Sequence, residues 1–353
     1  MPLPPQATFW DKLKFFTLIP RVIAAGLSRL ILRPFSRGLL PDSLFKDIAF
    51  SAVRTNLALI STAQEQWLNK TTEGAYLEFM KSKSLKPDTD VLNVGLKIHW
   101  LGSKNAKKTM LYFHGGGYVL AMSPGHLQFL ADIQRDVGDV GIAIVEYTLA
   151  PMGQYPVQLR QAAESLDWLL TKQGKRPGEI ILAGDSAGAN LALALISHML
   201  HPHPTVINKP ELSEPLASAI LISPWVNFAN TDPSIRQNVM SDFISEPSLE
   251  RWSKLFLGSS QIDNYNTPSQ ADSTWFKGID EKVKDILIWG GGGEVLIDSI
   301  ELIAQTLKAA HRQTEYVVEP GKSHEDFIVL KLLGYSEKAE GTQLIENWIK
   351  ARL

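Results

Sequence analysis

The pentapeptide GDSAG at residues 184–188 separates an apolar run, residues 180–183, from a helix-forming stretch, residues 189–200. This order predicts that Ser186 stands on a sharp turn from a β-strand into an α-helix, with its hydroxyl at the edge of a sheet. Glycines suit both ends of such a turn, because it needs strained backbone torsions and a close approach of neighbouring backbone. The pattern therefore favours an α/β protein with Ser186 as a nucleophile.

A second motif, HGGGY at residues 114–118, follows the strand-like residues 109–113. A G-x-S-x-G pattern alone arises by chance in roughly one chain in eight of this length, whereas this combination of strand and glycine run is far rarer. Attack by a serine on an acyl carbon creates an oxyanion, which backbone N–H groups can stabilise. We predict Gly116, Gly117 and Ala187 as these donors.

A serine hydroxyl needs a base to accept its proton and an acid to orient that base. Glu294 follows the strand-like residues 285–289 and a run of four glycines, and His324 lies in the loop after the strand-like residues 315–319. Both positions lie beyond the carboxyl ends of predicted strands. We therefore predict Ser186, Glu294 and His324 as nucleophile, acid and base, in the chain order of an α/β-hydrolase.

At this point the chain resembles the hormone-sensitive-lipase-like branch of the α/β-hydrolases, and more narrowly the fungal esterases related to steryl acetyl hydrolases. The resemblance runs from about residue 45 to the end. It implies an esterase of that fold, and it rests on HGGGY at 114–118, YTLAP at 147–151 with YP at 155–156, GDSAG at 184–188, SPW at 223–225, and His324.

The chain departs from this family at two positions. Glu294 stands where the acid is usually aspartate, and Glu325 stands where glycine commonly follows the base. Asp298, one helical turn after Glu294, stays open as an alternative acid. His114 is a further candidate base, but its place within the glycine loop favours a supporting role through hydrogen bonds.

Strand-like apolar runs alternate with helical stretches along most of the chain. This alternation predicts an α/β-hydrolase fold, with a mostly parallel central sheet flanked by helices and a helical cap. We expect cap or lid helices over residues 1–90, a catalytic domain over 91–353 that opens with a strand at 91–100, and a second lid segment at 228–280. The runs lie at 109–113, 142–147, 179–183, 218–223, 285–289 and 314–319.

Composition excludes several classes of function. The net charge of −2, from 35 basic and 37 acidic residues, argues against a nucleic-acid partner. The absence of cysteine excludes disulfides and thiolate sites and agrees with a reducing, cytoplasmic location. The histidines of HPHP at 201–204 have no carboxylate ligand nearby in the sequence, and the glycines at 290–293 lack a nucleotide-binding pattern. We predict no metal and no cofactor.

The segment 9–35 is strongly apolar but is interrupted by basic residues. The interruptions argue against a membrane span, and no small-residue cleavage site marks a signal peptide. Two interpretations remain open and are compatible: a helix that packs over the catalytic domain as part of the lid, and a basic amphipathic helix in peripheral contact with an intracellular membrane.

These observations predict a serine carboxylic-ester hydrolase, an esterase or deacetylase that forms an acyl-enzyme on Ser186. We predict Tyr118, Trp225 and Trp252 as substrate-binding residues. The aromatic residues of the second lid segment, together with the apolar N-terminal segment, suggest that the small-molecule substrate is a bulky hydrophobic ester, such as a steroid, terpenoid or polyketide ester of secondary metabolism. The alternative is a non-hydrolytic protein of the same fold, either a biosynthetic acyltransferase or cyclase or a ligand receptor.

Overall fold

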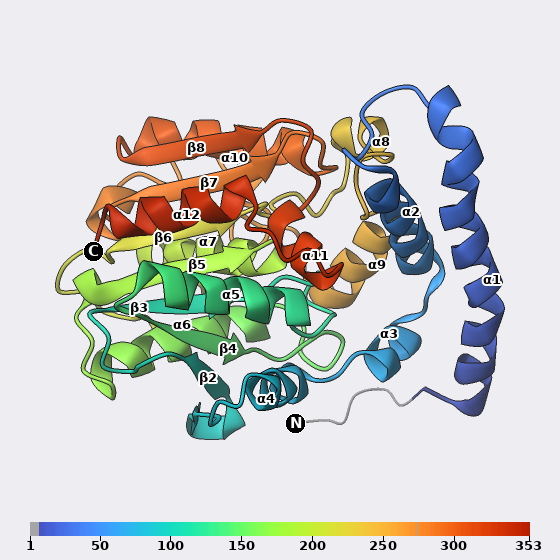
Figure 1. Ribbon diagram of the computed structural model, residues 1–353. Helices are drawn as coiled ribbons and strands as arrows, with labels where there is room; N and C mark the ends of the chain where they lie inside the picture. The colour runs from blue at the N-terminus through green and yellow to red at the C-terminus, as the bar shows by residue number, and fades with distance from the viewer. Residues whose placement is uncertain (1–6, 273) are drawn as a thin grey trace.

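The computed structural model describes residues 7–272 and 274–353 (Figure 1), so the first six residues of the predicted lid segment lie outside the described residues. One sheet runs through the molecule in the strand order β1-β2-β4-β3-β5-β6-β7-β8. Strands β3 to β8 are parallel, and β1 and β2 run antiparallel to their neighbours. The strands are β1 Thr89–Val91, β2 Lys97–Leu101, β3 Lys108–Phe113, β4 Val140–Glu146, β5 Ile180–Asp185, β6 Ser218–Ile222, β7 Ile286–Gly291 and β8 Thr314–Glu319.

The predicted α/β-hydrolase fold with a mostly parallel sheet is therefore confirmed, and each predicted apolar run from 109 onward coincides with a strand. The single strand expected at 91–100 is wrong. Strands β1 and β2 pair antiparallel there, with a short 3₁₀ turn, η2 (Asn93–Gly95), between them. Gly95 adopts φ +82° in this turn, a left-handed conformation that breaks an extended strand and reverses the chain.

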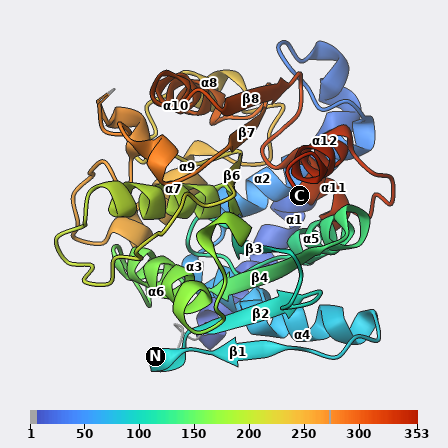
Figure 2. The same cartoon turned by 90° about the vertical axis from the view of Figure 1, so that its left-hand side faces the viewer.

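Helices cover both faces of the sheet, as the turned view in Figure 2 shows. One apolar core joins the sheet to α6 (Val157–Thr171), α7 (Ala187–Leu200) and α10 (Ile297–Ala310). The second core joins the opposite face to α4 (Thr72–Ser82), α5 (Pro124–Val137), α11 (Asp326–Leu332) and α12 (Glu340–Lys350). The parallel strands are thus buried on both sides, which explains their continuous apolar runs.

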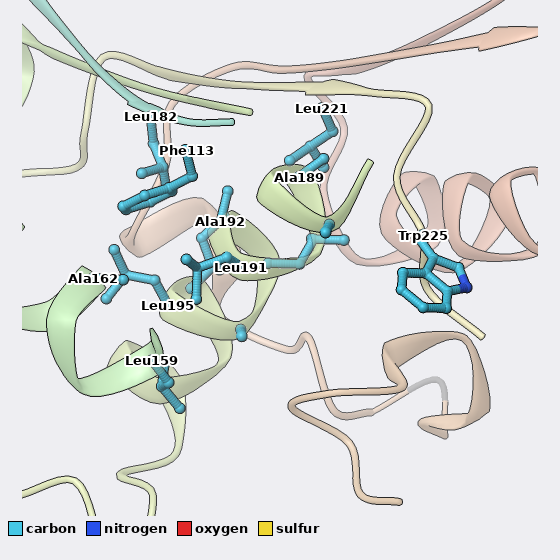
Figure 3. Close-up of a cluster of buried hydrophobic side chains, with 14 of the residues drawn as sticks. Phe113, Leu159, Ala162, Leu182, Ala189, Leu191, Ala192, Leu195, Leu221 and Trp225 are labelled. Atoms are coloured by element: carbon cyan, nitrogen blue, oxygen red, sulfur yellow. The ribbon is translucent and has the colours of Figure 1, made fainter. Parts of the chain in front are cut away.

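Helix α7, which starts immediately after Ser186, is buried on every side (Figure 3). Its alanine and leucine side chains pack between Phe113, Leu182 and Leu221 of the sheet and Leu159 and Ala162 of α6. A helix with apolar side chains on every side is stable only inside a protein. The start of α7, and with it the position of Ser186, is therefore fixed by the core.

Gly188 makes the contact between α7 and the end of β3 possible. A Cβ atom at this position would lie 1.9 Å from the carbonyl oxygen of Phe113, much closer than any side chain tolerates. Only glycine lets the first turn of α7 approach the strand that leads into the HGGGY loop. The two motifs are thereby held side by side.

The N-terminal helices lie beyond the carboxyl ends of the strands, with α1 outermost (Figure 1). They are α1 (Phe9–Leu32), η1 (Arg33–Phe35), α2 (Leu44–Leu59) and α3 (Thr62–Leu68). Helices α8 (Ser234–Gln237) and α9 (Glu246–Leu257) of the predicted second lid segment lie near the same end (Figure 1). The chain then returns through η4 (Pro268–Gln270) and η5 (Ile279–Glu281) to Val283, which pairs with Leu216 before β6 and β7 begin. The division of the chain into a cap and a catalytic domain stays a prediction.

A buried ion pair holds α1 against α2. Asp47 accepts hydrogen bonds from Arg29 Nε and from Arg33 Nη1, both at 2.9 Å, and Arg29 is only 4% exposed. If either arginine or the carboxylate were removed, a charge would stay buried without its partner, which is energetically costly. The pairing therefore fixes how α1 lies on the molecule.

We predict that Asp47→Ala lowers the free energy of unfolding by about 3–5 kcal/mol, because Arg29 then stays buried without its partner. The exposed pair between Glu250 and Lys254 offers a control, since its loss in Glu250→Ala costs less than about 0.5 kcal/mol. Denaturant unfolding of both variants measures the difference. A similarly small loss of stability in both variants would contradict the role of the Asp47 ion pair in holding α1 against α2.

Candidate active site

Ser186 occupies the turn between β5 and α7 and is 5% exposed. Its backbone has φ +49° and ψ −116°, a conformation that a residue with a side chain rarely adopts. The turn is held from both sides, because Ser186 N–H donates to the Ile222 carbonyl at 2.8 Å and its own carbonyl accepts from Trp225 N–H at 3.1 Å. A strained serine at a strand-to-helix turn is the geometry of a nucleophile elbow.

Glu294 and His324 lie together in the same region. Glu294 Oε2 is 2.7 Å from His324 Nδ1, while Glu294 Oε1 accepts from Gly291 N–H at 2.6 Å and from the Ser223 hydroxyl at 3.0 Å. Both side chains are fully buried, at 0% and 1% exposure. The carboxylate thus has partners on both oxygens and can orient the imidazole with its Nε2 directed away.

Gly291 brings the Glu294 loop close to the His324 loop. A Cβ atom at Gly291 would lie 2.4 Å from the carbonyl oxygens of both Lys322 and Ser323. The glycine run after β7 therefore serves close packing of these two loops. This agrees with its interpretation from the sequence as a turn that presents Glu294.

Asp298 occupies a different environment. It lies in the first turn of α10, and its Oδ2 accepts from the backbone N–H of Ser234 at 2.8 Å. Among the described residues, the carboxylate that contacts His324 Nδ1 is that of Glu294. The geometry thus supports Glu294 over Asp298 as the acid, a role that stays a prediction.

The environment of His324 favours its charged form. Burial lowers the pKa of His324, but the hydrogen bond and the charge of Glu294, with smaller effects from Asp242 and Asp185, outweigh it and raise the pKa above 6.5. A base with a raised pKa holds a proton more firmly after it has taken one. The arrangement suits an imidazole that becomes an imidazolium during the reaction.

The hydrogen bond expected between Ser186 and His324 is not formed in this structure. His324 Nε2 is buried and has no hydrogen-bond partner among the described residues, and Glu325 Oε1 lies 3.5 Å from it. In enzymes without substrate, such hydrogen bonds are often long and tighten when the substrate binds. The unpartnered Nε2 is therefore free to accept the proton of a serine hydroxyl.

The HGGGY loop takes a tight course next to α7. Gly116 and Gly117 adopt φ +110° and +60°, and Ala187 begins the helix with its N–H at the positive end of the helix dipole. Their amides come from the two elements that the Gly188 contact holds together. The structure thus brings the three predicted oxyanion donors to one region, and their role stays a prediction.

His114 lies under this loop, completely buried. Its Nδ1 is 2.7 Å from the Gly115 carbonyl and its Nε2 is 3.2 Å from the Thr72 hydroxyl. Burial lowers the pKa of His114 to about 4, so that the ring is neutral at neutral pH. These contacts agree with a supporting role for the loop rather than a role as base.

Glu325 belongs to a second buried cluster beside His324. It adopts φ +48°, which glycine would tolerate more easily, and its carboxyl lies next to Asp185 below Gly115. Burial, and then the charge of Asp185, raise the pKa of Glu325 well above its usual 4.5. Burial also acts to raise the pKa of Asp185, but the charge and hydrogen bond of His126 at 2.9 Å outweigh it and lower that pKa. Glu325 therefore keeps its proton and donates it to an ionised Asp185.

This cluster also has the donor atoms of a metal site. His126, Asp185 and Glu325 offer three ligand atoms within 4.8 Å of one another. The shared proton and the bond from His126 already account for their closeness. We therefore assign the cluster to the support of the Gly115 backbone, whose N–H donates to Asp185 at 2.8 Å.

The three predicted substrate-binding aromatics lie in different surroundings. Trp252 of α9 lies against the oxyanion loop, since a Cβ atom at Gly117 would be 2.6 Å from its ring. Tyr118 stacks on Phe256 and donates to Asn190 at 2.8 Å, and Trp225 is 1% exposed. A substrate contact stays a prediction for all three, and Trp252 is the one next to a proposed catalytic group.

Two residues of the site escaped the motif analysis. Ser223 connects the site, because its hydroxyl donates to Glu294 and accepts from Glu325 N–H at 3.2 Å. Asp242 is completely buried near Glu294, and burial is the main cause that raises its pKa to about 6. The SPW motif gave a signal for Ser223, whereas nothing in the sequence around Asp242 marks it.

The comparison with known families agrees with this geometry. A family described as alpha/beta hydrolase fold matches residues 110–328, which is more than half of the chain. The chain belongs to this family. The match contains the HGGGY and GDSAG motifs, Glu294 and His324.

Individual relatives point to the same branch. The chain is 29% identical over 229 residues to an acetyl-hydrolase of Streptomyces hygroscopicus, covering 63% of this chain and 70% of the relative. It is 27% identical to the esterase LipU of Mycobacterium tuberculosis, covering 66% and 75%. A solved esterase of the bacterial hormone-sensitive lipase family superposes with a TM-score of 0.64 at 24% identity, over 87% of this chain and 97% of that one.

The predicted membership in the hormone-sensitive-lipase-like branch is confirmed by these findings. The predicted enzyme class, a serine carboxylic-ester hydrolase, agrees with the activities in the names of the relatives. The narrower likeness to fungal steryl acetyl hydrolases stays a prediction.

We predict that Glu294→Gln lowers kcat for ester hydrolysis on the order of 10³- to 10⁴-fold, because an amide can no longer stabilise the imidazolium or select the tautomer. The midpoint of the acid limb of kcat/KM lies above pH 6.5 in the wild type, since only neutral His324 is active. In the variant this limb moves to lower pH. The control Asp298→Asn keeps activity within about threefold. A larger loss of kcat in Asp298→Asn than in Glu294→Gln would assign the role of the acid to Asp298.

A second prediction concerns Glu325→Gln. In the folded protein Glu325 stays protonated at pH values where it ionises in the unfolded chain, so its titration lowers wild-type stability as pH rises above 4.5. Glutamine removes this effect. Relative to wild type, the variant should gain stability from pH 4.5 upward, with a slope approaching about 1.4 kcal/mol per pH unit.

Denaturant unfolding at pH 4.5, 6 and 7.5 measures this slope. The exposed Glu337→Gln serves as a control and should change the free energy of unfolding by less than about 0.5 kcal/mol at each pH. A pH-independent difference for Glu325→Gln would show that Glu325 is ionised in the folded protein.

Proposed function

We propose that this protein is a serine carboxylic-ester hydrolase that forms an acyl-enzyme on Ser186 and acts on a hydrophobic ester. One observation carries the proposal. The 2.7 Å contact between Glu294 and His324 lies beside a strained serine and a glycine loop, in the order expected of an ester hydrolase. Catalytic chemistry of this kind needs a nucleophile, an oriented base and oxyanion donors in one place.

Each proposed residue has one task in the reaction. His324 Nε2 accepts the proton of the Ser186 hydroxyl while Oγ attacks the ester carbonyl, and the N–H groups of Gly116, Gly117 and Ala187 stabilise the oxyanion. Collapse of this intermediate breaks the ester bond, and the leaving alcohol takes the proton from His324. Water, deprotonated by His324, then attacks the acyl-enzyme and releases the acid.

Glu294 and Ser223 act through His324. Glu294 keeps the Nδ1 side protonated and stabilises the imidazolium that forms in both halves of the reaction. Ser223 holds the free oxygen of Glu294 and the backbone on the far side of His324. Both are positioning residues in this proposal.

The surroundings favour an ester with a large apolar part. Trp252 lies against Gly117. A cavity of about 260 Å³ lies beside the residues that follow the glycine loop, where Val119, Leu120 and Met152 line it together with charged residues such as Glu65 and Lys97, and it does not reach Ser186 or His324. Relatives named acetyl-hydrolase support a small acyl group, such as acetyl, on a bulky alcohol. Steroid, terpenoid and polyketide esters fit this description. A cytoplasmic location agrees with the absence of cysteine.

Hydrolysis of p-nitrophenyl acetate and of the acetate of a bulky apolar alcohol tests the proposal. Wild type should hydrolyse both, and Ser186→Ala should lose at least about 10³-fold in kcat. Trp252→Ala should lose about tenfold more kcat/KM on the bulky ester than on the small one, because it removes apolar contact area. The matched control Trp275→Ala lies away from the loop and should change both alike.

Three outcomes would change the proposal. Equal losses on both esters in Trp252→Ala would reject the pocket role of Trp252 and leave the hydrolase intact. Turnover that requires an acceptor alcohol instead of water would favour the acyltransferase alternative. Full activity of Ser186→Ala would overturn the proposed mechanism.

A further inference from the structure

The outward face of α1 is apolar over its whole length. Large apolar side chains recur there every three or four residues, and Phe16, Ile23 and Ile31 are 60%, 54% and 71% exposed. A helix that packs on a soluble protein normally turns a polar face to water. Exposed apolar surface of this extent marks a site of contact with another surface. The face consists of Phe9, Leu13, Phe16, Ile19, Ile23, Leu27, Leu30 and Ile31.

The opposite face of α1 is occupied by the protein itself. Gly26 lies so close to α2 that a Cβ atom there would be 3.2 Å from the Ile48 carbonyl oxygen. On the same face Arg29 enters the buried ion pair with Asp47. Only the outward face of α1 is therefore available to contact a partner.

This packing decides how α1 could meet a bilayer. By length and composition the segment Phe9–Phe35 could span one, since an 18-residue window in it has a mean hydropathy of 1.6 and is 17% buried. Spanning would place Arg29 in hydrocarbon and leave Asp47 buried without its partner, at a high cost for each charge. A helix that stays on α2 can instead lie flat in the interface, with its outer face among the acyl chains.

The charges on α1 match an anionic surface. Lys14 and Arg21 are exposed and seven residues apart, about two helical turns, so both project from one flank of the apolar face. From that flank their long side chains can reach lipid phosphates while the apolar face enters the bilayer. The single acidic residue of α1, Asp11, is occupied as a helix cap with Thr8.

We propose that α1 docks this protein in the plane of an anionic lipid bilayer, through the apolar outer face of α1 and the basic flank of Lys14 and Arg21. The apolar face contacts the acyl chains, and the basic flank contacts the phosphates. Binding strength in such helices adds the buried apolar area to the attraction of each basic residue for anionic lipid.

Docking would bring the proposed active site to the lipid surface, a consequence that rests on the proposed function. Below α1, helix α2 covers the loop of His324. Phe50 of α2 packs on Phe243 at 5.6 Å between ring centres, and Phe243 lies 6.1 Å from the His324 ring. Lys46 of α2 also pairs with Asp326, two residues after His324. An ester dissolved in the bilayer would thus meet the enzyme at the helices that close its site.

Cosedimentation of the full chain with lipid vesicles tests the proposal. Wild type should bind vesicles that contain phosphatidylserine and phosphatidylcholine more tightly than vesicles of phosphatidylcholine alone. The double variant Phe16→Ser/Ile23→Ser should lose roughly tenfold or more in binding to both. The variant Lys14→Ser/Arg21→Ser should lose about fivefold per removed charge, only on the anionic vesicles.

Two controls separate docking from folding and from catalysis. Ile207, an exposed apolar residue at a distant loop, should tolerate Ile207→Ser without loss of vesicle binding. Ser186→Ala should bind vesicles like wild type, so that binding is measured independently of the proposed activity. Far-UV circular dichroism checks that each variant keeps its helices.

The proposal is overturned if wild type does not bind vesicles, or if the outer-face variant binds as well as wild type. A concentration-dependent dimer that this variant abolishes, without vesicle binding, would assign the face to a second copy of the chain. An alkaline carbonate wash should release the bound protein. Resistance to the wash would show a spanning helix instead of one lying in the plane.

Discussion

The contact between Glu294 and His324 is the interaction around which the proposed active site is arranged. A buried carboxylate is stable only when its charge is compensated and its oxygens are hydrogen-bonded. Here Gly291, Ser223 and His324 supply those partners, from β7, the end of β6 and the loop after β8. Each partner comes from one of the adjacent strands β6, β7 and β8 or from the loop after it. The hydrogen bonds of Glu294 therefore depend on this order of strands in the sheet.

The surrounding acids follow from the same constraint. Burial is the main cause that raises the pKa of Asp242, to about 6, and the pKa of Glu325, with the charge of Glu294 adding to both. Asp185 can ionise because His126, Tyr112 and the Gly115 amide surround it. Asp185, which has these partners, is therefore negatively charged, whereas Glu325 keeps its proton. Glu325 stands where the resemblance led us to expect glycine, and its raised pKa keeps it neutral beside Asp185.

The sequence was sufficient for the parts of the structure that depend on local pattern. The parallel strands were visible as apolar runs, and the glycines around Ser186 and after His114 marked the two loops because only glycine permits the close contact at Gly188. The strand expected at 91–100 failed because Gly95 turns the chain, and alternation alone does not reveal a turn. The contacts of Ser223 and Asp242 and the pairing of Asp185 with Glu325 could not be foreseen, since they join residues 53 to 140 positions apart.

Intact mass spectrometry of a rapidly quenched reaction tests the central claim most directly, because an acyl-enzyme on Ser186 is a covalent species. With a fluorophosphonate, and with p-nitrophenyl acetate in a millisecond quench, wild type should gain the mass of one phosphonyl or acetyl group, and peptide mapping should place it on Ser186. Ser186→Ala should gain neither. A group on another residue, or ester turnover without any covalent species, would contradict the account.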